Sequence, residues 1–92
     1  MYTVIFSKSA DKDIINIVKH VAAENPQAAK RLGSKLLDLA LSLDSMPFRG
    51  SKVKKRRGVL KLIHGNYLIY YRINESEKTV EVLNFRHGAR MK

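Results

Sequence analysis

The stretch AAENPQAA, residues 22–29, separates two segments whose apolar residues recur at helical spacing. Proline disfavours helical geometry in the residue before it but suits the first position of a helix, so Asn25-Pro26 ends one helix and begins the next, with Asn25 as its cap. The pattern predicts a first helix over about residues 8–23 and a second over about residues 26–44. The short connection indicates an antiparallel helical hairpin.

Each predicted helix carries one apolar stripe. Asp11 and Asp13 are expected to face outward, and Ser7 or Ser9 is expected to cap the first helix. Gly33 costs the second helix roughly 1 kcal/mol of propensity relative to alanine, which indicates a close approach to the first helix. The stripe residues are Ala10, Ile14, Ile17, Val18 and Val21 in the first helix and Ala29, Leu32, Leu36, Leu39, Ala40 and Leu43 in the second.

The opening residues and three later segments show the alternation and composition typical of strands. Short connections join the last three segments, which indicates hairpins and therefore a meander. Pro47, Gly50 and the basic run of residues 51–57 predict a loop before this meander. The predicted strands cover residues 2–6, 59–63, 67–73 and 79–85.

These elements predict an α+β fold in the order β-α-α-β-β-β. The helical hairpin would pack on one face of a mostly antiparallel four-stranded sheet. A chain of 92 residues has material for only one hydrophobic core, so residues 1–92 are expected to form a single domain.

The charge balance points to a polyanionic partner. The chain has 18 Lys and Arg against 8 Asp and Glu, a formal net charge of +10. Residues 45–74 contain basic side chains and no acid. Nucleic acid, an acidic protein, or both in turn would complement such a charge, whereas a basic surface that serves only solubility is the alternative.

Other classes of function are disfavoured by composition. The chain has no cysteine and three scattered histidines, so we expect no disulfide, metal site or cofactor. The polar Ser7 and Lys8 follow directly on residues 1–6, which leaves no apolar stretch for a signal peptide or a membrane span. A cytoplasmic protein without a membrane partner is therefore expected.

Several segments, in their order and spacing, together resemble one protein family. The segments are FSKSADKDI at 6–14, NPQAA at 25–29, LDSMPFRG at 43–50, YLIYYR at 67–72 and VLNFRHGAR at 82–90. With these segments the chain resembles the RelE/ParE superfamily of type II toxin–antitoxin toxins, and it is nearer to the ParE branch.

The resemblance implies the same fold and a toxin that a cognate acidic antitoxin neutralises. It implies one of two activities. ParE-like toxins poison DNA gyrase, whereas RelE-like toxins are ribosome-dependent endoribonucleases that act on messenger RNA.

Metal-free RNA cleavage needs a proton acceptor for the 2′-hydroxyl, cations for the phosphorane charge and an acid for the leaving oxygen. Lys61 and Arg86 could stabilise charge, and His87 could titrate near neutral pH. The RelE pattern, however, has an arginine where this chain has Tyr67, and it has a tyrosine near the C-terminus. No aromatic residue follows Arg90 here.

These departures and the His-Gly-Ala-Arg ending favour a gyrase inhibitor over a ribonuclease. Simpler interpretations exist. His87 could do no more than form a backbone hydrogen bond that holds the C-terminal residues in place, and the basic run could be a solvated loop without a partner. A plain nucleic-acid-binding module is a third class, but neither helix has the pattern of a recognition helix. The candidate target-binding residues are Arg86, His87, Arg90, Lys54, Lys55, Arg56 and Arg57.

Overall fold

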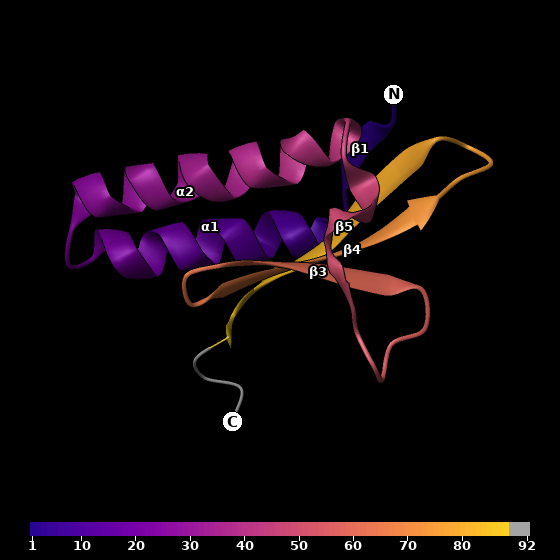
Figure 1. Cartoon of the computed structure of the whole chain (residues 1–92). Coiled ribbons are helices and arrows are strands. Elements are labelled where there is room, and N and C mark those ends of the chain that lie inside the picture. The colour runs from indigo at the N-terminus through magenta and orange to yellow at the C-terminus, as the bar shows by residue number, and fades with distance from the viewer. Residues whose placement is uncertain (89–92) are drawn as a thin grey trace.

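The computed structural model describes residues 1–88, in which a helical hairpin lies on one face of a five-stranded sheet (Figure 1). No helix within these residues is long and apolar enough to cross a membrane. The elements are β1 (Thr3–Phe6), α1 (Lys8–Ala22), α2 (Pro26–Leu41), the 3-10 turns η1 (Ser42–Asp44) and η2 (Pro47–Arg49), β2 (Ser51–Lys52), β3 (Val59–His64), β4 (Tyr67–Asn74) and β5 (Thr79–His87).

The helix boundaries follow the predicted caps. The Ser7 hydroxyl oxygen accepts a hydrogen bond from the Ala10 N–H at 3.0 Å, and the Asn25 side-chain oxygen accepts one from the Ala28 N–H at 3.0 Å. A Cβ atom on Gly33 would lie 3.0 Å from Val18 Cγ2, which confirms the close approach of the two helices. The α-helical part of α2 ends three residues earlier than predicted, because the chain tightens into η1 at Ser42.

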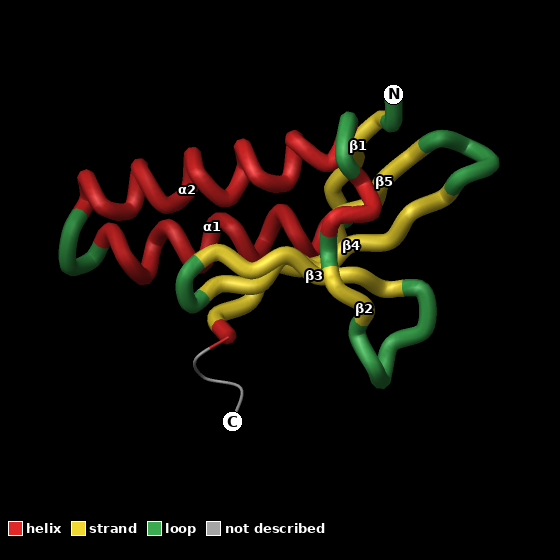
Figure 2. Tube along the Cα trace, viewed as in Figure 1, coloured by secondary structure: helices red, strands yellow, loops and turns green. Residues whose placement is uncertain are grey.

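The strand order is β1-β5-β4-β3-β2, with β1 parallel to β5 and the other pairs antiparallel. The α+β fold is therefore confirmed, with one strand more than predicted. The extra strand, β2, is only two residues long and pairs Ser51 with Lys61 and Lys52 with Leu60. Its polar residues have low strand propensity, so the sequence predicted a loop; the pairing arises because the returning β3 lies alongside (Figure 2).

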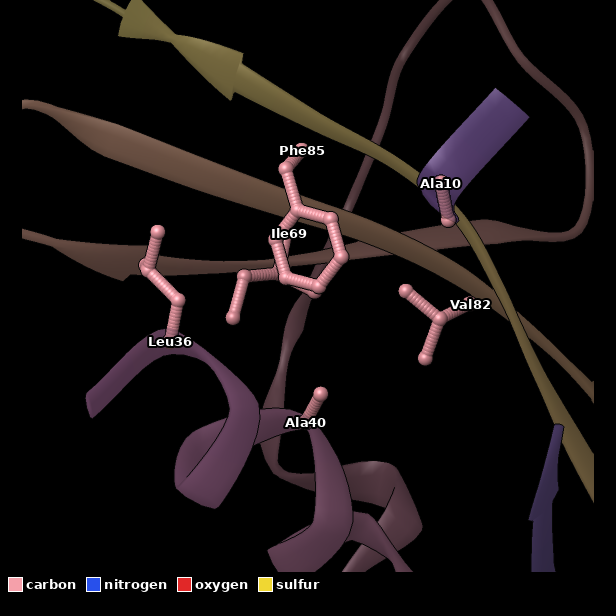
Figure 3. Close-up of a cluster of buried hydrophobic side chains, with 6 residues drawn as sticks. All are labelled: Ala10, Leu36, Ala40, Ile69, Val82 and Phe85. Carbon is pink, nitrogen blue, oxygen red and sulfur yellow. The ribbon is translucent and has the colours of Figure 1, made fainter. Parts of the chain in front are cut away.

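The hydrophobic core lies between the helices and β5, β4 and β3. Leu36 and Ala40 of α2 face Ile69, Val82 and Phe85 of the sheet (Figure 3). A second cluster of Leu43, Tyr71 and Val80 continues the core under η1. Buried residues of both helices thus contact the central strands, as the apolar stripes predicted.

A β-bulge changes the phase of β5. Tyr70 pairs with Asn84 but Tyr71 pairs with Val82, so Leu83 is an extra residue in β5. The bulge lies where β5 loses its parallel neighbour, because β1 ends at Phe6, the partner of Val82. The start of α1 takes the place of β1 beyond this point.

Side chains of the β1–α1 junction satisfy the backbone of this bulge. The Ser7 hydroxyl donates to the Leu83 carbonyl at 2.8 Å while it caps α1. The Asp13 carboxylate accepts from the Phe85 N–H at 3.1 Å and from the Asn84 side-chain amide at 3.2 Å. The expectation that Asp13 faces outward was therefore wrong, because the free edge of β5 supplies donors that the helical pattern alone did not reveal.

We expect Asp13→Ala to lower the free energy of unfolding by about 1–3 kcal/mol, because it leaves the Phe85 N–H and the Asn84 amide without an acceptor. Asp11→Ala is the matched control, since Asp11 is an exposed acid in the first turn of the same helix. Its loss should cost no more than about 0.3–1 kcal/mol through the helix dipole. Urea unfolding followed by circular dichroism measures both, and equal costs would contradict the proposed role of Asp13.

Core packing gives a second expectation. Leu36→Ala should cost about 2–5 kcal/mol, because Leu36 is fully buried against the sheet. Its neighbour Leu37 is 38% exposed on the other side of the helix, so Leu37→Ala is the control and should cost less than half as much. A cost for Leu36→Ala below about 0.5 kcal/mol would mean that the helical face is misassigned.

Candidate functional site

The face of the sheet opposite the helices is defined by the alternation along β4. Ile69 and Tyr71 are buried beneath the helices, so the residues between and beside them point to the other face. Directly paired residues of neighbouring strands share a face. This helix-free surface, called the open face below, carries Val59, Arg72, Glu81, Lys61, Tyr70, Ile63, Leu68 and Arg86.

The open face combines cations with partly covered apolar residues. Arg72 and Glu81 form an ion pair at 3.6 Å, and both side chains are exposed, so the pair adds little stability. The Arg56 guanidinium lies 5.3 Å from the centre of the Tyr70 ring, which brings the basic loop over this face. Figure 2 shows this loop projecting on the side of the sheet away from the helices.

His87 lies on the opposite side of the sheet from Arg86. It pairs with Tyr67, and the two rings meet edge to face with centroids 4.8 Å apart. Asn16, Ile17 and His20 of α1 complete a small cavity of about 230 Å³ around them. Within residues 1–88 the buried Nδ1 atom of His87 has no hydrogen-bond partner. The Gly88 N–H, which donates to the Asn66 carbonyl, holds this end of the chain instead.

The three residues predicted for RNA cleavage do not converge. Lys61 and Arg86 share the open face, whereas His87 and Tyr67 point toward α1. RNA cleavage would require the proton acceptor and both charge-stabilising cations to surround the same phosphate. These three side chains do not meet that requirement, because they lie on two sides of the sheet. The third C-terminal candidate, Arg90, lies outside the described residues.

The basic loop of residues 53–58 is exposed and ordered by its own backbone. The Val53 N–H donates to the Val59 carbonyl and the Arg56 N–H donates to the Val53 carbonyl, at 3.0 and 3.2 Å. Gly58 closes the loop with a φ of 77°, which glycine adopts without strain. This defined turn therefore exposes four cations, Lys54, Lys55, Arg56 and Arg57.

A groove of about 660 Å³ separates this loop from η2. We call it the basic groove. Its apolar surface comes from Phe48, Val53, Val59, Leu60 and Ile73, and its charged rim comes from Lys52, Lys54, Arg56, Arg57 and Glu75. Three of the four predicted loop cations, Lys54, Arg56 and Arg57, thus line the basic groove, and Lys55 does not.

Tyr71 anchors the η2 side of the basic groove, a role that the sequence did not reveal. Its buried hydroxyl donates to the Pro47 carbonyl at 2.7 Å and accepts from the Gly50 N–H at 3.0 Å. A Cβ atom at position 50 would lie 2.5 Å from that hydroxyl and 2.7 Å from the Lys61 carbonyl, so only glycine fits. The Pro47-x-x-Gly50 spacing in the sequence was the available signal.

Burial raises the pKa of Tyr71 above its ordinary value, opposed by the Gly50 N–H and the Arg49 charge. The neutral phenol is therefore the form that the fold favours. As for a metal, no three His, Asp or Glu side chains among residues 1–88 gather into a possible binding group. The exposed cations of the groove rim and of the open face suit both surfaces to binding anions.

The comparisons with known proteins agree on the fold. The family model for the ParE toxin of the type II toxin–antitoxin system parDE matches residues 4–92. A chain of the chromosomal ParDE system from P. aeruginosa superposes with a TM-score of 0.82 at 16% identity, over 95% of this chain and 96% of that one. That similarity shows a RelE/ParE-like fold.

Chains of RelBE complexes are also similar. One from the RelBE2 toxin–antitoxin complex of Mycobacterium tuberculosis has a TM-score of 0.71 and 27% identity, over 94% of this chain and 96% of that one. One from the intact E. coli RelBE complex has a TM-score of 0.62 and 16% identity, over 92% and 94%. No curated protein matches the sequence.

Tyr71→Phe should lower the free energy of unfolding at neutral pH by about 1–3 kcal/mol, because the Gly50 N–H loses its buried acceptor. Since the folded-state pKa of Tyr71 is raised, the neutral phenol contributes stability that is lost as the pH rises through that pKa. The difference in the free energy of unfolding between the wild type and Tyr71→Phe should therefore shrink in strongly alkaline solution. Chemical unfolding at a series of pH values measures it.

Tyr70→Phe is the control for this series, because it keeps the ring beneath Arg56. It should change the free energy of unfolding by less than about 0.5 kcal/mol. If Tyr71→Phe changes the free energy of unfolding as little as this control does, the Tyr71 hydroxyl does not anchor η2.

Proposed function

We propose that this chain, which belongs to the ParE toxin family of type II toxin–antitoxin systems, inhibits DNA gyrase and is neutralised by a cognate antitoxin. The match over residues 4–92 makes it a toxin of this class. Gyrase as the target, and hence the cytoplasm as the place of action, is the part that we propose.

The separation of His87 from Lys61 and Arg86 is the observation that favours gyrase over RNA as the target. In-line attack by a 2′-hydroxyl needs its proton acceptor and the cations on one side of a surface. The sheet lies between these groups, with the His87 ring against Tyr67 and α1. Inhibition by binding makes no such demand, since it requires only a complementary surface.

The proposed contact surface for gyrase is the open face near the end of β5, together with the basic loop. Arg86 is exposed there, and residues 54–57 project from the same side of the sheet. Arg90, outside the described residues, remains a candidate for this contact, whereas His87 faces α1 and would have to meet the target from the other side of the sheet. Clustered cations of this kind raise the rate of association with an acidic partner and make it sensitive to salt.

The systems to which similar chains belong support a cognate antitoxin as a partner. The similar chains described above come from ParDE and RelBE systems, and the two RelBE structures among them are toxin–antitoxin complexes. The net charge of +10 favours an acidic antitoxin. Buried apolar contacts would supply most of its affinity, while charge would raise the rate of association.

A RelE-like activity, with ribosome and messenger RNA as partners, is the second candidate. It is favoured by the 27% identity to a chain of the M. tuberculosis RelBE2 complex. Lys61 and Arg86, which share the open face, would then stabilise phosphate charge. Tyr67, which occupies the place of the expected arginine, offers no such charge.

Purified protein should inhibit supercoiling by gyrase and leave translated messenger RNA intact. Arg86→Ala should weaken inhibition by about tenfold, because an exposed cation at the centre of the proposed contact is lost. Lys30→Ala, which removes an exposed cation from α2, is the matched control and should inhibit like the wild type.

Messenger RNA cleavage on ribosomes, without gyrase inhibition, would replace the gyrase proposal by the RelE-like one. His87→Ala and Arg86→Ala should then abolish cutting while leaving antitoxin binding largely unchanged. The two readouts, DNA topology and transcript ends, can be taken from the same cells.

A further inference from the structure

We propose that the basic groove is a docking site for an acidic peptide segment that carries apolar side chains. The proposed function enters only as the source of that segment, which would be the antitoxin. The groove has an apolar floor, a rim of net positive charge and two fixed walls.

The floor of the basic groove is aliphatic. Val53, Val59 and Ile73 line it, and Phe48 stands at its side with 60% of its surface exposed. An exposed aromatic residue beside a concave aliphatic surface is the usual anchor point of an interface. The occupant must therefore bring apolar side chains of its own.

The rim of the groove carries a net positive charge, with four cations against one acid. Lys52, Lys54 and Arg57 are exposed, and none of the three forms an ion pair with an acid within residues 1–88. Arg56 is engaged with the Tyr70 ring, and Glu75 is the single acid of the lining. Carboxylates that flank the apolar anchor of a peptide would complement this rim.

Both walls of the groove are held in place without a partner. On one side, η2 is fixed by the bonds of Tyr71 to Pro47 and Gly50, and the Phe48 ring meets Tyr2 edge to face at 6.4 Å. On the other side, the backbone hydrogen bonds of residues 53–59 fix the loop. A preformed groove lowers the entropic cost of binding.

The same features disfavour nucleic acid as the occupant. Single strands bind through stacked bases and phosphate contacts, which need accessible aromatic faces. Phe48 is the single aromatic residue of the lining, Tyr70 is 8% exposed beneath Arg56, and the floor is aliphatic, so the groove offers no row of rings for successive bases. A sugar-phosphate chain has no apolar side chain to bury there, whereas a peptide segment does.

Three short synthetic peptides provide the probe. The first alternates leucine with aspartate and glutamate, the second replaces the acids by their amides, and the third replaces leucine by serine. Fluorescence anisotropy with the full chain should give binding of the first and affinities at least about tenfold weaker for the other two. Amide NMR shifts should move at residues 48, 53 and 59.

Paired variants locate the site. Phe48→Ser and the double variant Lys54→Ala with Arg57→Ala should each weaken the first peptide by about tenfold or more. Ile15→Ser, a similarly exposed apolar residue on α1 at 52%, and the double variant Lys30→Ala with Lys35→Ala should bind like the wild type. Circular dichroism confirms that each variant is folded.

The proposal is overturned if the first peptide does not bind, or if Phe48→Ser binds it as the wild type does. It is also overturned if short single-stranded DNA, rather than the peptide, shifts the resonances of the groove. Gyrase is absent from these measurements. Peptide binding without inhibition of supercoiling would therefore contradict the proposed function alone, and inhibition without peptide binding would contradict the groove alone.

Discussion

The junction between β1 and α1 fixes β5, the strand that joins β1 to the antiparallel part of the sheet. The Ser7 hydroxyl caps the helix and holds the bulged Leu83 carbonyl, and Asp13 holds the next free N–H of β5. Since β5 lies between β1 and β4, these bonds place the helical hairpin relative to the whole sheet. The core beneath the hairpin and the orientation of the end of β5 both depend on them.

The bulge decides which side of the sheet each C-terminal side chain faces. A strict alternation from Val80 and Val82 would place Arg86 on the helix side, together with Asn84. The extra residue reverses this phase, so that Phe85 and His87 face the helices and Arg86 faces outward. One inserted residue thus separates a cationic open face from a histidine-lined cavity.

Much of the fold could be predicted from local signals. Asn25-Pro26 and Ser7 mark helix ends by chemistry that acts within four residues, and Gly33 signals a close helix contact. The bulge, β2 and the role of Asp13 could not be predicted, because each depends on a partner distant in sequence. For the same reason the composition revealed a basic loop but not the groove, whose second wall is fixed by Tyr71.

The pairing of β1 with β5 also has a consequence for how the chain acquires its fold during synthesis. Ser7 and Leu83 are 76 positions apart, and contacts of such separation form late because the loop between them must first close. β1 is made before β5 and finds its neighbour only when β5 has also been made. A nascent chain that stops before β5 therefore lacks the strand on which both the core and the exposed Arg86 depend.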